Sequence, residues 1–240
     1  MSWFTHWFDS PYYHTLYKDR DEKEAQVFIN NLVEHLQIPK GSMLIDIACG
    51  KGRHATYFNS LGLDVVGVDL SPNSIASATK NANSTLQFSV HDMREVYQKN
   101  NFDVVTNLFT SFGYFENNTD EQKAINAMAS NLKLGGFLVI DFMNVKKVIA
   151  NLVAKEQKTI DGIIFDITRK IEAGHIIKDI HITDGEEKQH FQEKVKAITL
   201  ADYSKFISNA GLKIIDIFGN YKLDSFDEKI ADRLILICKK

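Results

Sequence analysis

The sequence predicts a doubly wound α/β fold that carries a small antiparallel insert. Short runs that are apolar throughout alternate with segments of helical periodicity over residues 21–142, a pattern typical of a parallel sheet covered on both faces. Strand-like stretches joined by tight polar turns follow over residues 160–198, and such turns indicate hairpins. The 240 residues are 44% hydrophobic and 25% charged, which is ordinary for a globular protein and sufficient for a core.

The first half of the chain supplies the alternation. Residues 21–36 place apolar side chains at i, i+3 and i+4 spacing, which predicts an amphipathic helix, and Pro39 and Gly41 end it. We expect the apolar strands at residues 43–48, 65–69, 86–90, 102–109 and 137–142. The helices between them are expected up to Leu61, over residues 71–82 and over residues 120–132. Apolar strands that are separated by helices should run parallel, because a helical connection returns the chain to the same edge of the sheet.

In the second half, after a short helix expected over residues 145–154, the alternation of strands and helices gives way to successive strand-like stretches. Turns at residues 172–174 and 184–186 separate three strand-like stretches, which predicts a three-stranded antiparallel insert at residues 160–171, 175–183 and 189–198. A helix and two strands then complete a seven-stranded sheet with an antiparallel C-terminal hairpin, at residues 200–209, 213–218 and 233–239. The predicted organisation is one domain of residues 1–155 and 199–240, interrupted by a β-subdomain of residues 156–198.

Charge and cysteine content exclude several classes of protein. The 28 basic and 31 acidic side chains leave a formal net charge of −3, whereas a general nucleic-acid binder needs concentrated Lys and Arg to displace phosphate counterions. Cys49 and Cys238 form neither a disulfide framework nor a zinc motif, and the histidines show no metal spacing. The N-terminus lacks signal-peptide features and the apolar runs are too short to span a bilayer, so we expect a cytoplasmic protein without a bound metal.

A glycine-containing turn follows the first strand, in Asp46-Ile-Ala-Cys-Gly50-Lys-Gly52. Glycines there let the backbone approach a ligand closely, and the N-terminus of the next helix offers free N–H groups to an anionic ligand. Asp69 ends the second strand 19 residues after Gly50, the spacing at which a carboxylate accepts hydrogen bonds from ribose hydroxyls. This combination predicts a nucleoside-binding site.

Two cofactor classes share this combination. Residues 50–55 satisfy the G-x-G-x-x-A pattern and so permit NAD. Against NAD, Asp46 lies in the strand, where its carboxylate can meet a cationic amino group. In addition, Asp92 and Met93 follow the third strand, where an acid and an apolar residue can hold an adenine. The chain also builds antiparallel structure after its fifth strand, and so lacks the second βαβαβ half of a dinucleotide fold.

At this point the sequence resembles the class I S-adenosylmethionine-dependent methyltransferases, over about residues 44–141 and the final hairpin. Five motifs carry the resemblance in order, with Ala48 where glycine is usual: residues 46–52, 65–71, 91–93, 102–109 and 132–141. The resemblance implies a Rossmann-like fold and S-adenosylmethionine as cofactor. Together with the spacing, it indicates as cofactor-binding residues Tyr13, Arg20, Asp46, Ala48, Cys49, Gly50, Gly52, Asp69, Leu70, Asp92, Met93, Asn107 and Leu108.

The lead-in of residues 7–20 and the segment 108–115 are similar to a bacterial branch of this family that carries a β-insert and is presumed to act on small molecules. Seven aromatic side chains occur in the first 17 residues. They fit either a lid that covers the cofactor and excludes water or a segment that packs on the domain surface. Methyl transfer depends mainly on positioning, so the sequence need not show a catalytic motif, and His14 and Tyr114 are the candidates. Cys49 is interpreted as a packing residue rather than a nucleophile.

The sequence thus favours S-adenosylmethionine-dependent methyl transfer to an oxygen or nitrogen nucleophile of a small molecule. Asn107 begins a segment without the two prolines of the N-P-P-Y/F motif, which disfavours methylation of adenine or glutamine amino groups. Three alternatives stay open: an RNA or tRNA methyltransferase, an NAD-dependent oxidoreductase, and a module that binds the cofactor without catalysis. The insert is expected to shape the acceptor site or to form a homodimer contact.

Overall fold

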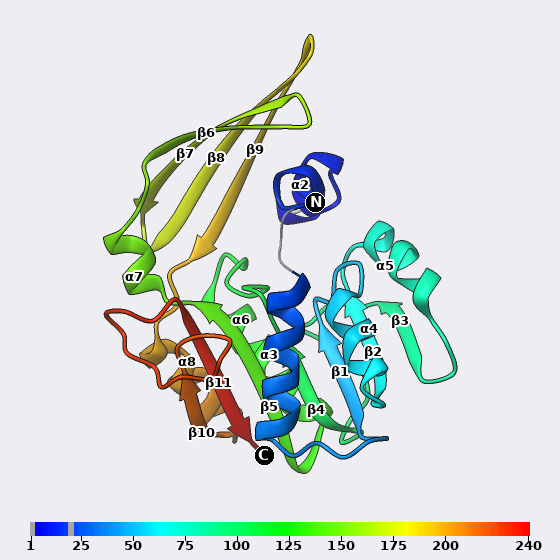
Figure 1. Ribbon diagram of the computed structural model, residues 1–240. Coiled ribbons are helices and arrows are strands. Elements are labelled where there is room, and N and C mark those ends of the chain that lie inside the picture. Colours follow the sequence, from blue (N-terminus) through cyan, green and yellow to red (C-terminus); the bar gives the residue numbers. More distant parts are fainter. Residues whose placement is uncertain (1–2, 19–21) are drawn as a thin grey trace.

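The structure is a computed structural model that describes residues 3–18 and 22–240, so Arg20 lies outside the described residues. Its main sheet has seven strands in the order β10-β11-β5-β4-β1-β2-β3 (Figure 1). The parallel strands are β1 (Met43–Ile47), β2 (Asp64–Asp69), β3 (Leu86–Val90), β4 (Phe102–Asn107) and β5 (Leu132–Met143). At one edge β11 (Arg233–Lys239) runs antiparallel to β5 and to β10 (Lys213–Phe218). The predicted seven-stranded, doubly wound sheet is confirmed.

Helices cover both faces of this sheet and bury the apolar side chains of its strands. On one face lie α3 (Glu22–His35) and α4 (Arg53–Ser60), and on the other lie α6 (Asn118–Asn131) and α8 (Leu200–Asn209). The short α5 (Pro72–Ala78), followed by a 3-10 turn at Thr79–Asn81, packs along β2 and β3. No helix in the described part of the chain is both long and apolar enough to cross a membrane.

The insert is a four-stranded antiparallel sheet, so the prediction of three strands is wrong. Its strands are β6 (Lys155–Ile160), β7 (Ile163–Glu172), β8 (His175–Asp184) and β9 (Glu187–Lys196). The missed strand is β6, which precedes the first predicted stretch and shares only Ile160 with it. Asp161 and Gly162 join β6 to β7 in a two-residue hairpin turn with φ of 54° and 82°. An Asp-Gly pair is a typical sequence for this kind of turn, so the signal was present in the sequence.

A short helix, α7 (Val145–Ala150), leads from the main sheet into the insert. It ends four residues before the predicted boundary at Ala154. The reason is a strand contact, since the carbonyl of Ala154 accepts a hydrogen bond from the backbone N–H of Arg169 in β7 at 2.8 Å. The insert therefore begins directly after Ala154, with Lys155 as the first residue of β6.

Two short helices at the N-terminus, α1 (Trp3–Phe8) and α2 (Pro11–Leu16), lie beside the insert and beyond the strand ends of the main sheet (Figure 1). Trp7 is fully buried among apolar side chains of the insert, and its ring centroid lies 4.7 Å from that of Phe191 in β9. The helices therefore pack on the insert rather than on the helical layers of the main domain.

Candidate functional site

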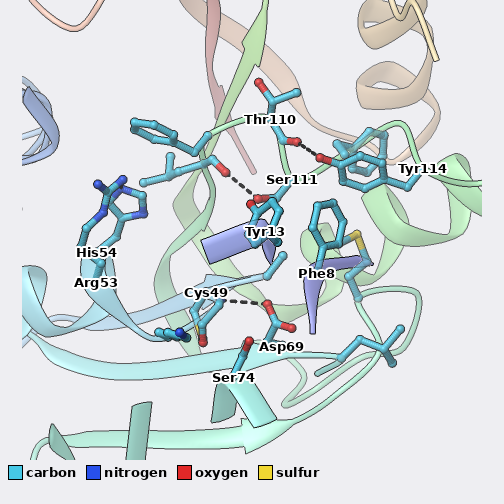
Figure 2. A pocket seen from close by; sticks show the side chains of 18 of the residues that line it. Phe8, Tyr13, Cys49, Arg53, His54, Asp69, Ser74, Thr110, Ser111 and Tyr114 are labelled. Carbon is cyan, nitrogen blue, oxygen red and sulfur yellow. Dashed lines mark hydrogen bonds between the residues drawn. The ribbon is translucent and has the colours of Figure 1, made fainter. Parts of the chain in front are cut away.

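A cavity of about 820 Å³ lies at the carboxyl ends of the parallel strands, within the range of ligand pockets. It opens where the chain order reverses between β1 and β4, which is where open α/β sheets bind ligands. Its walls come from the loops after β1 to β4, from the N-terminal helices and from β9. In Figure 2, Phe8 and Tyr13 reach into the pocket on the side of Ser111 and Tyr114, across from Asp69 and Cys49.

The loop after β1 forms the floor of the cavity and needs an unusual backbone. Ala48, Gly50 and Gly52 all have positive φ, at 60°, 55° and 79°. A Cβ on Gly50 would meet no atom within 4 Å, and Gly50 lines the cavity, so this position leaves room for a ligand. A Cβ on Gly52 would lie 2.6 Å from the ring of Phe88. Gly52 thus permits close packing between the loop and β3, and it does not line the cavity.

Asp69 joins the ends of the first two strands. Its Oδ2 accepts a hydrogen bond from the backbone N–H of Gly50, and its Oδ1 accepts one from the backbone N–H of Ser71, both at 2.8 Å. Burial raises the pKa of Asp69 above its usual value, while these two N–H groups act against that rise. The carboxylate lines the cavity, so its remaining lone pairs can accept hydrogen bonds from hydroxyl groups of a ligand.

Asp46 lies beneath this floor and is 1% exposed. Its Oδ1 accepts a hydrogen bond from the hydroxyl of Thr106 at 2.8 Å, whereas Oδ2 has no hydrogen-bond partner among the described residues. Burial raises the pKa of Asp46 to about 7, and the nearby charge of Asp69 adds to the rise. A buried carboxylate oxygen without a partner is costly. Asp46 does not itself line the cavity, so the ammonium group of a bound S-adenosylmethionine would meet it as a negative charge beneath the floor.

The loop after β3 closes one end of the cavity. Asp92, Met93 and Arg94 all line it, as does Leu70 after β2. The guanidinium of Arg94 donates to both carboxylate oxygens of Asp92, with 2.6 Å between Nη2 and Oδ2, and this lowers the pKa of Asp92. The predicted adenine acid is thus present in the cavity but held by a neighbouring cation.

The two predicted residues at the end of β4 differ in their positions relative to the cavity. Leu108 lines the cavity, whereas Asn107 is fully buried and its side-chain amide donates to the carbonyl of Ile47 at 3.0 Å. Asn107 therefore joins β4 to β1 instead of facing the cavity. The strand ends at Asn107 rather than at Phe109, because Phe109 and Thr110 both have positive φ.

Two of the three N-terminal residues predicted to contact the cofactor or the acceptor, Tyr13 and His14, line the cavity, whereas the third, Arg20, lies outside the described residues. Tyr17 and Phe8 also line the cavity. Phe8 contacts Tyr13 and Tyr114, with ring centroids 5.0 Å and 5.3 Å apart. The hydroxyl of Tyr114 donates to the carbonyl of Thr110 at 2.5 Å. The aromatic lead-in thus both packs on the insert and forms one wall of the cavity.

Several residues of the site escaped the sequence analysis. Arg233 lines the cavity, and its Nε donates to Oδ1 of the fully buried Asp141 at 2.7 Å. Phe109 also lines it, and the guanidinium of Arg53 lies 4.8 Å from the centre of the Phe109 ring. Glu193, which lies in the insert, also lines the cavity. Arg233 and Glu193 belong to no local motif, since each becomes part of the site only through contacts distant in sequence. Phe109 ends the fourth motif, where its residue type alone did not mark it as part of the cavity wall.

Cys49 lines the cavity but is 8% exposed, and burial raises the pKa of its thiol well above the usual value. A reactive cysteine needs its thiolate form. The environment therefore supports the interpretation of Cys49 as a small packing residue, although its backbone belongs to the floor of the cavity.

Comparison with known proteins agrees with this geometry. Residues 44–136 match the family described as "Methyltransferase domain". A Streptomyces venezuelae dTDP-3-amino-3,4,6-trideoxy-alpha-D-glucopyranose N,N-dimethyltransferase is 27% identical over 190 residues, which cover 73% of this chain and 77% of that protein. The crystal structure of an S-adenosylmethionine-dependent methyltransferase from Clostridium acetobutylicum has a TM-score of 0.79 and 20% identity, covering 98% and 97% of the two chains.

An amino pentose methyltransferase from Micromonospora echinaspora, solved with S-adenosylmethionine bound, has a TM-score of 0.72 and 18% identity, covering 96% of this chain and 97% of that one. The cavity offers two features that this cofactor needs, an acid for the ribose and an open glycine turn, and the buried carboxylate of Asp46 lies beneath its floor. The matched domain, the relatives and the fold agree. The chain thus carries a methyltransferase domain at residues 44–136, and over most of its length it is similar to S-adenosylmethionine-dependent methyltransferases.

Proposed function

We propose that this enzyme methylates an amino nitrogen of a small molecule, with amino sugars as the first class of acceptor to test. The observation that carries the proposal is the composition of the cavity wall opposite the cofactor residues. Phe8, Tyr13, Tyr17 and Tyr114 present aromatic rings there, and Glu193 adds a carboxylate. Aromatic faces and carboxylates both attract ammonium groups and N–H donors. The names of similar proteins, which include sugar N,N-dimethyltransferases and a glycine/sarcosine N-methyltransferase, support an amine acceptor.

Residues at one end of the cavity bind the cofactor, and residues at the other end bind the acceptor. When bound, S-adenosylmethionine supplies an electrophilic methyl carbon on a sulfonium group. Asp69 and Asp46 hold the cofactor's hydroxyl and ammonium groups, and Gly50 leaves space above the floor. The aromatic wall excludes water and orients the acceptor. Positioning of this kind can lower the barrier by about 7–11 kcal/mol in favourable cases, so an amine whose lone pair is already available needs little further help.

We also propose that α1 and α2 act as a lid. Besides the insert, this segment contacts the cofactor side of the cavity, where Asp9 accepts hydrogen bonds from the hydroxyl of Ser71 and, at 2.6 Å, from the side-chain amide of Asn73. Ser71 caps the start of α5, two residues after Asp69. The segment thus spans the cavity from the main sheet to the insert, and its release would open the site to solvent.

The acceptor proposal is tested with paired substrates. Purified enzyme and S-adenosylmethionine are incubated with dTDP-3-amino-3,6-dideoxyglucose, with glycine, and with the hydroxyl counterparts dTDP-6-deoxyglucose and glycolate. Mass spectrometry then reads the addition of one or two methyl groups. Methylation of at least one amine with no methylation of its hydroxyl counterpart supports the proposal. Methylation of a hydroxyl compound in preference to its amine contradicts it.

A second arm tests the RNA alternative. The acidic and basic side chains nearly balance, at 31 and 28, which favours a small acceptor over a polyanion. We therefore expect no methyl incorporation into bulk tRNA under conditions in which a small-metabolite extract is labelled. We place the reaction in the reducing cytoplasm, a proposal supported by Cys49 and Cys238, which are both buried and unpaired.

A further inference from the structure

Glu193 occupies an unusual position on the inner face of β9. Side chains alternate along a strand, so Glu193 shares its face with Phe191 and Val195. Both of these neighbours are buried apolar residues, at 9% and 8% exposure. The side chain of Glu193 is itself only 14% exposed. A carboxylate on an apolar face is expensive unless other groups satisfy it, so its presence calls for an explanation.

Three groups surround this carboxylate, two of them from the N-terminal segment. The indole N–H of Trp7 and the hydroxyl of Tyr17 each donate a hydrogen bond to Oε1 of Glu193 at 2.7 Å. Lys178 lies directly opposite Glu193 in the β8–β9 pair. Its ammonium group donates to the Tyr17 hydroxyl and lies 3.5 Å from Oε2 of Glu193. Oε1 is therefore fixed by two short hydrogen bonds.

Oε2 is the less satisfied of the two oxygens. Among the described residues its polar neighbour is Lys178, at 3.5 Å, a separation that is long for a charge-assisted hydrogen bond. Burial lowers the pKa of Lys178, and the neighbouring Glu193 acts against this change. Because Glu193 lines the cavity, Oε2 retains lone pairs that a ligand's N–H can reach.

We propose that Oε2 of Glu193 accepts a hydrogen bond from the N–H of the acceptor amine and thereby selects amines over alcohols. This inference rests on the proposed function. At neutral pH an aliphatic amine binds as its ammonium form, which the negative charge of Glu193 attracts more strongly than it attracts a neutral hydroxyl. The ammonium must then lose one proton, to Glu193 or to water, before its lone pair can attack the methyl carbon. Trp7 and Tyr17 act as positioning residues, because they hold Oε1 and so fix the direction of Oε2.

The variant Glu193→Gln tests whether Glu193 recognises the amine or serves only as a lid anchor, that is, as a residue that holds the N-terminal segment through Trp7 and Tyr17. The amide oxygen of Gln can still accept from Trp7 and Tyr17, so the wall is retained while the negative charge is lost. The matched control is Asp179→Asn in β8, which removes a carboxylate from the same sheet. Asp179 is outside the cavity lining and pairs with His190 and Gln192. The thermal midpoint of each variant checks that it is folded.

The experiment measures discrimination by calorimetry with S-adenosylhomocysteine present at saturation. Binding of dTDP-3-amino-3,6-dideoxyglucose is compared with binding of dTDP-6-deoxyglucose, and binding of glycine with that of glycolate. In Glu193→Gln the preference for the amine should fall about tenfold or more, while the affinity for S-adenosylhomocysteine changes less than twofold. Asp179→Asn should keep the wild-type preference.

The outcomes separate the two proposals. If wild-type enzyme prefers the amine and Glu193→Gln keeps that preference, the role of Glu193 is wrong and the proposed function stands. If both members of each pair weaken equally in Glu193→Gln, Glu193 is a lid anchor only. If the wild-type enzyme shows no preference for the amine in either pair, the proposed function fails, and the inference fails with it.

Discussion

Asp141 and Arg233 stand 92 positions apart in the chain, yet Nε of Arg233 donates to Oδ1 of Asp141 at 2.7 Å where β11 runs antiparallel to β5. The same carboxylate accepts a hydrogen bond from the backbone N–H of Phe109 at 2.8 Å, and Nη2 of Arg233 donates to the hydroxyl of Thr110 at 3.0 Å. Phe109 and Thr110 have φ of 59° and 62°, which is costly for such residues. The ion pair thus holds a strained loop against the cavity.

Breaking this pair should strongly destabilise the protein. Arg233→Met leaves the fully buried Asp141 without its cation, and we expect a loss of about 3–5 kcal/mol in the free energy of unfolding, measured by urea denaturation. Lys133→Met is the control, since Lys133 pairs with Asp103 at 43% and 38% side-chain exposure and should cost about 0–1 kcal/mol. Equal losses in the two variants would show that the Asp141 pair has no special role.

Ala48→Gly should stabilise the protein slightly. Ala48 has a φ of 60° in the loop after β1, a conformation that glycine adopts without a Cβ penalty. The expected gain in the free energy of unfolding is about 0.5–1 kcal/mol. Ala82→Gly is the matched control, because Ala82 has a φ of −62° and glycine there only adds entropy to the unfolded chain. A loss of stability in both variants would show that the backbone at Ala48 is not strained.

Asp46 should make cofactor binding and apoprotein stability depend on pH in opposite directions. Burial raises the pKa of its carboxyl in the folded protein to about 7, so the protonated form stabilises the apoprotein. That stability is fully present below the unfolded pKa near 4 and is lost as the pH rises through about 7. Binding of the cofactor's ammonium group instead favours the ionised form, so the affinity for S-adenosylhomocysteine should rise over the same interval.

Asp46→Asn tests both directions, because the amide cannot ionise. Without cofactor, we expect this variant to unfold at a higher temperature than the wild type at pH 8, by the equivalent of about 1–3 kcal/mol. The pH dependence of S-adenosylhomocysteine binding near pH 7 should be largely lost. An unchanged pH profile in Asp46→Asn assigns the dependence to another group.

Release of the N-terminal segment should expose the cavity. Asp9→Ala removes the acceptor of two hydrogen bonds, from Ser71 and Asn73. In hydrogen exchange we expect amides of residues 6–16 to exchange about tenfold faster in this variant, and S-adenosylhomocysteine to dissociate faster. Tyr12→Phe is the control, since among the described residues the Tyr12 hydroxyl makes long hydrogen bonds, of 3.3 Å and 3.4 Å, with exposed acids of the insert. Unaltered exchange in Asp9→Ala contradicts the lid.

Much of the cofactor half of the molecule could be predicted from the sequence because its signals are local. The strands that are apolar throughout predict the parallel sheet, and the turn from Asp46 to Gly52 and the acid at Asp69 lie at strand ends by chain order alone. The Asp161-Gly162 pair also signals a hairpin, but β6 before it is largely polar and exposed, so no apolar pattern marked it as a strand.

The acceptor half depends on contacts that no local pattern records. Glu193 looks like any acid on a polar strand until β8 brings Lys178 opposite it and α1 brings Trp7 onto it. Arg233 likewise opens the last strand, and only the antiparallel pairing with β5 carries it to Asp141. Only the tertiary structure brings such residues together. Sequence motifs therefore predict the cofactor site, whereas they do not predict the residues of the proposed acceptor site.

The central claim is that the cavity above Asp69 and Gly50 holds S-adenosylmethionine, and calorimetric titration with S-adenosylhomocysteine tests it most directly. Asp69→Ala should bind this ligand about tenfold or more weakly than wild type, since a charged hydrogen-bond acceptor is lost. Asp64→Ala, at the opposite end of the same strand, should bind like wild type. Equal affinity in wild type and a folded Asp69→Ala, or tighter binding of NADH than of S-adenosylhomocysteine by wild type, would contradict the claim.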